Sequence, residues 1–253
     1  MSPVKLDDRL FGEEPAREAR FDVRETWAEL VNLPDEHPTR QLEYLHRQLN
    51  EEANVMENAA RSLAAFPEAD WSVRKGLARQ CADEARHALN YRRLFEKRGG
   101  TLGQFPVMNF QYRILGRITT LAGRLAVQNR SFEADGLDAA TFAMHEARGK
   151  GDHELAEMYD AQQADEVVHI RFANEYLQRS MQRDPRSALD MARALTQAAQ
   201  AFAQVFADGG TSVHKYGVAA EARLEAGFST AEVDMAVRLS DERRAAVRAR
   251  TEG

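Results

Sequence analysis

One pattern that occurs twice constrains this chain most: Asp-Glu-x-x-His, at Asp83–His87 and again at Asp165–His169. Residues three apart share one face of an α-helix, so each motif presents a carboxylate and an imidazole to the same point. Two such helices, with one Glu from each of two more, build the di-metal carboxylate site of a four-helix bundle. The chain must therefore supply two further Glu residues at matching heights.

The geometry of a helical hairpin identifies the first of these Glu residues. Apolar residues at helical spacing predict a helix over Gln41–Ala65, and a second helix over Trp71–Arg98 follows a break at Phe66–Asp70. In an antiparallel hairpin, residues equally far from the turn lie at equal height. The first motif lies about 17 residues after the turn, and counting the same number of residues back along the preceding helix reaches Glu51 or Glu52. Glu52 lies on the apolar stripe and Glu51 on its flank, so we predict Glu52 as the ligand.

The second half of the chain repeats this construction. A helix predicted over Asp152–Ser180 carries the second motif, and Gly149-Lys150-Gly151 forms the turn before it. Counting back from that turn reaches Glu133, and residues 110–132 contain no other Glu. The added Glu precedes the motif Glu by 32 residues in the first half and by 33 in the second. The two halves therefore form a weak internal repeat.

The predicted ligand set contains four carboxylates and two imidazoles: Glu52, Glu84, His87, Glu133, Glu166 and His169. A metal-bound His usually donates its other N–H to an oxygen acceptor. Asp83 and Asp165 are therefore either acceptors for the two His residues, across the site, or solvated helix residues. A third Glu-x-x-His, Glu43–His46, lies two or more turns too far from the hairpin turn to share the site.

Composition favours an all-α fold that carries its own sizeable core. No run of residues alternates convincingly as a strand, and Gly and Pro are sparse in the long segments. The net charge is −6 with both signs interspersed, which argues against nucleic acid and against a membrane surface as partners. No signal peptide or membrane span is expected, and the single Cys81 suits a cytoplasmic protein.

The remaining segments are expected to surround the bundle. We predict an N-terminal arm over residues 1–40, the four-helix bundle over 41–180 and a C-terminal helical extension over 181–253. The third core helix is expected over Pro106–Gly136, and the extension is expected to contain helices over Ser187–Ala207 and Val213–Ala226 and one that opens at a capping box, Ser229–Glu232. These last helices either close the end of the bundle or build a homodimer interface.

Several segments together resemble a bacterial ferritin-like family with two Asp-Glu-x-x-His motifs: Glu52–Glu57, Asp83–His87, Phe132–Asp138, Gly151–Glu154 and Asp165–His169. More distantly, the pattern is similar to the ferritin-like di-iron superfamily, which includes rubrerythrins, bacterioferritins, ribonucleotide reductase small subunits, multicomponent monooxygenases and di-iron N-oxygenases. The resemblance covers roughly residues 41–180, with a looser similarity around Ala226–Ser229. It implies the fold and the metal site, whereas one such site supports many different reactions.

The ligand types indicate the chemistry. A hard, mostly oxygen ligand set suits Fe or Mn better than a structural zinc site built from Cys. We therefore interpret the protein as an O2-activating oxidase or oxygenase with two Fe ions, or a mixed Mn/Fe pair, acting on a small organic substrate by hydroxylation, N-oxygenation or a related oxidation. Iron handling as a ferroxidase and a non-catalytic, metal-supported structural role are the alternatives. No dinucleotide-binding motif appears, so electrons would come from an external donor, the substrate or a bound reductant.

Overall fold

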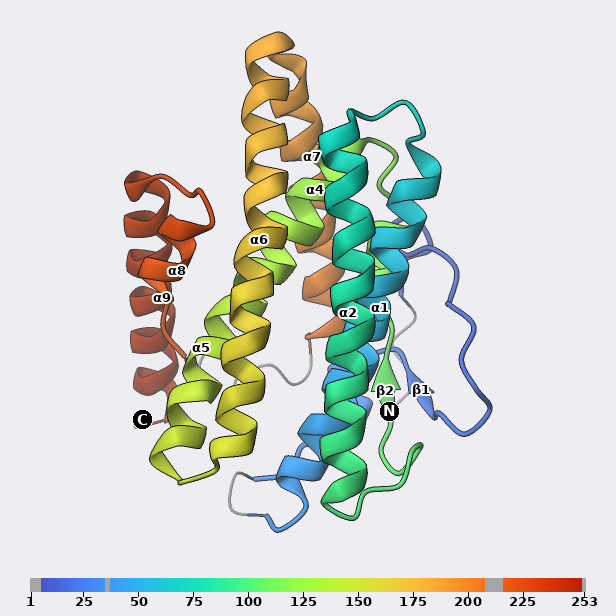
Figure 1. The fold of residues 1–253 in the computed structure, drawn as a ribbon, viewed down its shortest axis with the longest axis vertical. Coiled ribbons are helices and arrows are strands. Elements are labelled where there is room, and N and C mark those ends of the chain that lie inside the picture. Colours follow the sequence, from blue (N-terminus) through green and yellow to red (C-terminus); the bar gives the residue numbers. More distant parts are fainter. Residues whose placement is uncertain (1–5, 35–36, 208–215, 252–253) are drawn as a thin grey trace.

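Long helices make up most of the molecule and place the two motifs near its centre. The computed structural model describes residues 6–34, 37–207 and 216–251, with side chains described as far as residue 246. Four helices carry the predicted ligands (Figure 1): α1 (Arg40–Ala65), α2 (Trp71–Lys97), α5 (Glu133–Gly149) and α6 (His153–Arg183). The all-α prediction is confirmed. In the part of the chain that the structure describes, no helix combines the length and apolar character needed to cross a bilayer.

The core helices are arranged as two antiparallel hairpins, α1 with α2 and α5 with α6. The first turn follows Ala65, because Pro67 disfavours a helical conformation at Phe66. In the second turn Gly151 has a φ of +74°, a left-handed conformation that favours glycine. The Asp152 carboxylate then accepts a hydrogen bond from the Leu155 N–H at 3.3 Å and so caps α6. Helices α2 and α6 pack against each other, which brings the two motifs face to face.

The prediction of one helix over Pro106–Gly136 is wrong in two respects. The chain instead forms, in order, β2 (Val107–Met108), α3 (Phe110–Leu115), α4 (Leu121–Val127) and a π-helical turn (Gln128–Phe132) that continues into α5. Thr120 restarts the helix, because its side chain accepts a hydrogen bond from the Gly123 N–H at 3.2 Å. Gly136 does not end the helix, since it is an exposed position inside α5 where a single glycine costs only about 1 kcal/mol.

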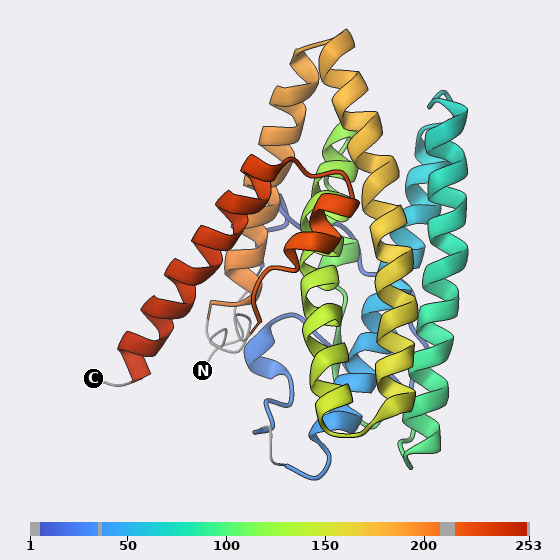
Figure 2. The same ribbon diagram turned by 60° about the vertical axis from the view of Figure 1, so that its left-hand side comes forward.

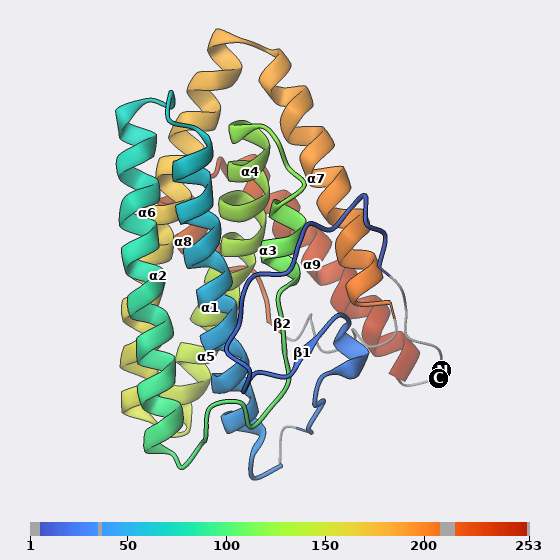
Figure 3. The ribbon, with the colours of Figure 1, turned by 90° about the vertical axis from the view of Figure 1, so that its right-hand side faces the viewer.

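The N-terminal segment runs across the outside of α1 and α3 (Figure 3). Its strand β1 (Val23–Arg24) pairs in parallel with β2, a two-residue sheet too short to produce an alternating sequence pattern. The Arg17 guanidinium connects the segment to α1 by donating hydrogen bonds to the Glu57 carboxylate at 2.8 Å and to the side-chain oxygen Oδ1 of Asn50 at 2.9 Å. These contacts hold the N-terminal segment against α1.

The C-terminal helices pack around the bundle, and α7 also contacts the N-terminal segment. Helix α7 (Arg186–Val205) agrees with the helix predicted over Ser187–Ala207, and it lies against α4. Helix α8 (Ala220–Glu225) contacts α5 and α6, and α9 (Thr230–Thr251) slants away from the bundle (Figure 2). The predicted division into arm, bundle and extension stays a prediction.

The predicted start of α9 is confirmed, whereas the predicted start of the helix before it is wrong. The capping box before α9 is confirmed, because Ser229 N–H donates to Glu232 at 2.9 Å and Glu232 N–H donates back to Ser229 Oγ at 3.3 Å. The helix predicted over Val213–Ala226 is wrong at its start, and residues 213–215 lie outside the described residues. Ahead of α8, the Ala219 N–H donates to Asp138 Oδ1 at 2.9 Å, which holds the chain against α5 instead of in a helix.

The third Glu-x-x-His motif has a structural role. The Glu43 carboxylate pairs with the Arg47 guanidinium on its own helix at 3.0 Å. His46 is 0% exposed, and its Nε2 accepts a hydrogen bond from the Gly103 N–H at 2.9 Å. Its ring packs among three aromatic side chains: Phe21, Phe95 and Phe105. Neither residue belongs to a potential metal-binding group within the described residues, in agreement with the hairpin argument.

His46 should make the fold sensitive to mild acid. Burial lowers the pKa of His46 to about 4, so the unfolded chain takes up this proton near pH 6.5 while the folded chain resists it. The stability due to neutral His46 is therefore complete above about pH 6.5 and declines as the pH falls toward 4. From about pH 7 to pH 5, the free energy of unfolding should drop by about 2 kcal/mol more in the wild type than in His46→Gln.

Denaturant unfolding of both proteins at the two pH values measures this difference. Gln is the matched replacement, because its side-chain oxygen can accept the Gly103 N–H without titrating. Equal losses of stability in the two proteins would contradict the assignment to His46.

Candidate metal centre

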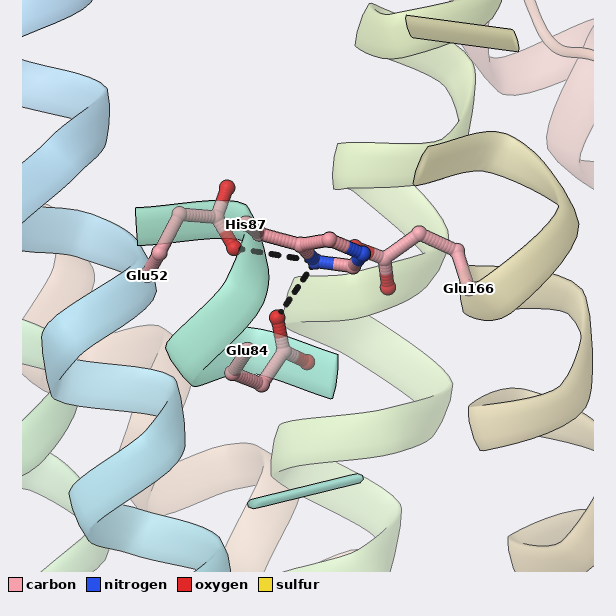
Figure 4. A group of neighbouring side chains, drawn as sticks. All are labelled: Glu52, Glu84, His87 and Glu166. Atoms are coloured by element: carbon pink, nitrogen blue, oxygen red, sulfur yellow. Dashed lines mark hydrogen bonds and ion pairs between the residues drawn. The ribbon is translucent and has the colours of Figure 1, made fainter. Parts of the chain in front are cut away.

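The six predicted ligands come together between the hairpins, although they lie on four different helices. Glu52 lies on α1, Glu84 and His87 on α2, Glu133 at the first position of α5, and Glu166 and His169 on α6. None is more than 6% exposed. They form two overlapping groups, each with ligand atoms within 4.8 Å of one another: Glu52, Glu84, His87 and Glu166 in one, and Glu84, Glu133, Glu166 and His169 in the other. Figure 4 shows the first group, with side chains from three helices pointing toward one another.

Both imidazoles point the same nitrogen inward. His87 Nδ1 lies 2.9 Å from Glu84 Oε2 and 3.6 Å from Glu52 Oε2. His169 Nδ1 lies 3.2 Å from Glu84 Oε1 and 3.8 Å from the nearest oxygen of Glu166. Glu84 and Glu166 belong to both groups, so these two carboxylates could contact an ion in either group, whereas Glu52 and Glu133 each belong to a single group.

The centre contains buried polar atoms that its own hydrogen bonds leave unsatisfied. Burial raises the pKa values of Glu52 and Glu133 well above the ordinary value for Glu, and it also raises the pKa of Glu166. Three buried atoms in the second group make no hydrogen bond of normal geometry, although the first and last of them lie 3.2 Å apart: Glu84 Oε1, Glu166 Oε2 and His169 Nδ1. Such atoms are rare in folded proteins because leaving them unpaired costs about 1–3 kcal/mol each. A divalent cation among them would satisfy all three, so the residues fit a metal.

The outward nitrogens of the two His residues bond to aspartates on the opposite helix. His87 Nε2 lies 3.2 Å from Asp165 Oδ2, and His169 Nε2 lies 3.1 Å from Asp83 Oδ2. The hydrogen bond from His169 holds the pKa of Asp83 well below its ordinary value. The crossed arrangement agrees with the acceptor role considered for both aspartates, and it leaves each Nδ1 free to face the centre.

Two arginines on α2 close the outer side of this arrangement. The Arg86 guanidinium lies 3.0 Å from Asp83 and 2.6 Å from Asp165, and Arg79 contacts the same two carboxylates at 3.2 and 3.7 Å. Both arginines are about half exposed, so each ion pair contributes little stability by itself. Because each arginine on α2 also contacts Asp165 on α6, the two ion pairs link α2 with α6.

Sequence analysis missed two residues of the centre, Gln80 and Gln162. Both are buried, at 0% and 8% exposed, and both lie against the carboxylates. The signal was present, because each motif extends backward into the same longer pattern, Gln-x-Ala-Asp-Glu-x-x-His. An amide binds metals poorly, so this longer pattern does not by itself mark either glutamine as part of a metal site.

Glu51 and Glu52 occupy the environments that the apolar stripe predicts. The Glu52 side chain is buried beside His87, whereas Glu51 faces outward and pairs with Arg47 at 3.2 Å and Gln48 at 2.8 Å. The hydrogen bonds place Glu52 in the centre and Glu51 outside it.

Removing the charge at Glu52 should stabilise the metal-free protein. Because burial raises the pKa of Glu52 above 4.5, ionised Glu52 opposes folding increasingly as the pH rises. Glu52→Gln should therefore raise the free energy of unfolding of the metal-free protein by about 1 kcal/mol or more at neutral pH. The gain should disappear below about pH 4.5, where Glu52 is protonated in both states.

Chelator-treated protein and denaturant unfolding test this prediction. Glu51→Gln is the matched control and should change stability by no more than about 0.5 kcal/mol. Stabilisation by Glu51→Gln but not by Glu52→Gln would show that the register of α1 is shifted by one residue.

Comparison with known proteins places the chain in a family without assigning it a reaction. Neither the curated proteins nor the solved structures give a match. One protein-family model does match, and its residue range includes all six predicted ligands, both aspartates and both glutamines. Because this match extends over residues 4–234, the chain belongs to the family described as "Protein of unknown function (DUF455)".

Proposed function

We propose that this protein binds two iron ions, or one manganese and one iron ion, and uses them to activate O2 for the oxidation of a small organic molecule. The observation that carries the proposal is the pair of overlapping buried ligand groups that share Glu84 and Glu166. Four carboxylates balance the charge of two divalent ions, and an oxygen-rich set with one imidazole per group suits iron and manganese. Reduced ions held there would supply electrons to O2.

The residues around the ligands support a redox role. The His87 and His169 rings are held by aspartates from opposite helices, so neither ring can turn away when the charge at the centre changes. Burial of all six ligands excludes bulk water, which would otherwise compete for the open coordination positions. An external donor, the substrate or a bound reductant would restore the electrons.

A second candidate, a metal-supported structural protein without turnover, is favoured by the same burial. All six ligands are nearly inaccessible, and Asp83, Asp165 and the arginines that pair with them lie over the outward sides of both imidazoles. In this reading the ions neutralise the buried carboxylates and hold the two hairpins together. The two candidates differ in whether reduced, metal-loaded protein consumes O2.

Metal analysis tests the ligand set. Protein loaded with Fe(II) or Mn(II) should retain about two ions per chain after desalting. His87→Ala and His169→Ala should each lose about one of them, because each removes the single imidazole of one group. His46→Gln should retain both ions, since His46 lies outside both groups. Wild-type protein with almost no metal, or equal losses in all three variants, would refute the assignment.

An O2 electrode then separates the candidate functions. Oxygenase activity predicts O2 uptake by the reduced, iron-loaded protein that increases with a small amine or other metabolite from a screen. Oxidation of many Fe(II) ions per chain would instead indicate iron handling, and stabilisation by metal without O2 uptake would indicate the structural role.

A further inference from the structure

Two buried glutamines form reciprocal bonds between the hairpins at the centre. Gln162 on α6 donates from Nε2 to Glu52 Oε1 on α1 at 2.9 Å and to Glu166 Oε1 at 3.4 Å. Gln80 on α2 donates from Nε2 to Glu133 Oε1 on α5. Each glutamine lies four residues before the motif Glu of its own helix and contacts the unshared carboxylate of the other hairpin. The pseudo-symmetry of the ligands therefore extends to their hydrogen-bond donors.

A second hydrogen bond fixes which end of each amide faces the carboxylate. The Tyr91 hydroxyl donates to Gln162 Oε1 at 2.8 Å, and Asn129 Nδ2 donates to Gln80 Oε1 at 3.1 Å. Because a hydroxyl or amide donor occupies the carbonyl oxygen, the amide NH2 group must point toward the carboxylate. Tyr91 is 2% exposed and Asn129 is 1% exposed, so water cannot easily replace either donor.

We propose that Gln80 and Gln162 are positioning residues that orient the two unshared carboxylates, Glu133 and Glu52, for the metal ions; this rests on the proposed di-metal function. A carboxylate in a bundle can rotate about its last bond and present either oxygen. Gln162 engages Oε1 of Glu52 and leaves Oε2 on the side of the His87 imidazole, 3.6 Å from Nδ1. A neutral amide orients the oxygen without a positive charge that would repel the ion.

The two halves differ in how much they depend on their glutamine. Glu133 also accepts hydrogen bonds from Gln128 at 3.4 Å and from Asn129 at 3.3 Å, both in the π-helical turn before it. Among the described residues, Gln162 is the only amide side chain that bonds Glu52. Loss of Gln162 should therefore disturb the metal position at Glu52 more than loss of Gln80 disturbs the metal position at Glu133.

Anaerobic titration with Co(II) tests this proposal, because both the affinity and the visible spectrum of Co(II) report on the ligands of each ion. We expect Gln162→Met, which keeps the length of the side chain and removes the amide, to weaken one of two ions by about 10- to 100-fold. The Co(II) absorption of that ion should change as well. Gln80→Met should produce a smaller change, and it should affect the other ion.

The adjacent Gln163 provides a matched control. Its amide donates to Thr141 Oγ1 at 2.8 Å, toward α5 and outside both ligand groups. Gln163→Met should therefore bind two Co(II) ions with wild-type affinity and spectrum. If Gln163→Met weakens Co(II) binding as much as Gln162→Met does, the weakening does not depend on the contact between Gln162 and Glu52, and the proposal is overturned.

Tyr91→Phe provides a second route if Gln162→Met does not fold. It removes only the hydroxyl that fixes the Gln162 amide, so it should weaken and spectrally alter the same ion to a smaller extent. If Gln162→Met folds and binds two Co(II) ions with wild-type affinity and spectrum, the positioning role alone is overturned. If Gln162→Met does not fold, the same result in Tyr91→Phe overturns it. Wild-type protein that binds no Co(II) would instead remove the di-metal function together with this proposal.

Discussion

Four carboxylates buried within a few ångströms of one another are the constraint on which the rest of this structure depends. Each would cost several kcal/mol to bury as an unpaired ion. The surrounding side chains offset that cost in layers: imidazoles and amides contact the carboxylates, aspartates contact the imidazoles, and arginines contact the aspartates. Three atoms remain without a hydrogen bond even so. The bundle is thus arranged around buried polar groups that its own side chains do not fully satisfy, which is the strongest argument that a cation belongs there.

The position of the ligands could be predicted because helical hairpins obey simple geometry. The rise per residue is constant, so Glu52 and Glu133 follow from the two motifs and the position of each turn. The same counting excluded Glu43, which pairs with Arg47 on its own helix, and His46, which accepts a hydrogen bond from the Gly103 N–H. Periodicity separated Glu52 from Glu51, because only Glu52 lies on the buried stripe.

Other features depend on contacts that no local pattern records. The break between α3 and α4 and the π-helical turn before Glu133 arise where the chain packs against the arm and α7. The late start of α8 depends on a bond from Ala219 to Asp138, which is 81 positions away. Gln80 and Gln162 were visible in the sequence, but an amide binds metals poorly and its contacts depend on the opposite hairpin. The reaction cannot be predicted from the ligands, because one ligand set supports several chemistries.

The crossed bonds between the hairpins also bear on how the chain acquires its structure during synthesis. The ribosome releases α1 and α2 first, yet the aspartate that His87 contacts lies 78 positions later and the amide that Glu52 contacts lies 110 positions later. Glu52 and His87 on the first hairpin therefore lack these partners until α6 has been made. The hydrogen bonds of the first hairpin are completed only when the second hairpin packs against it.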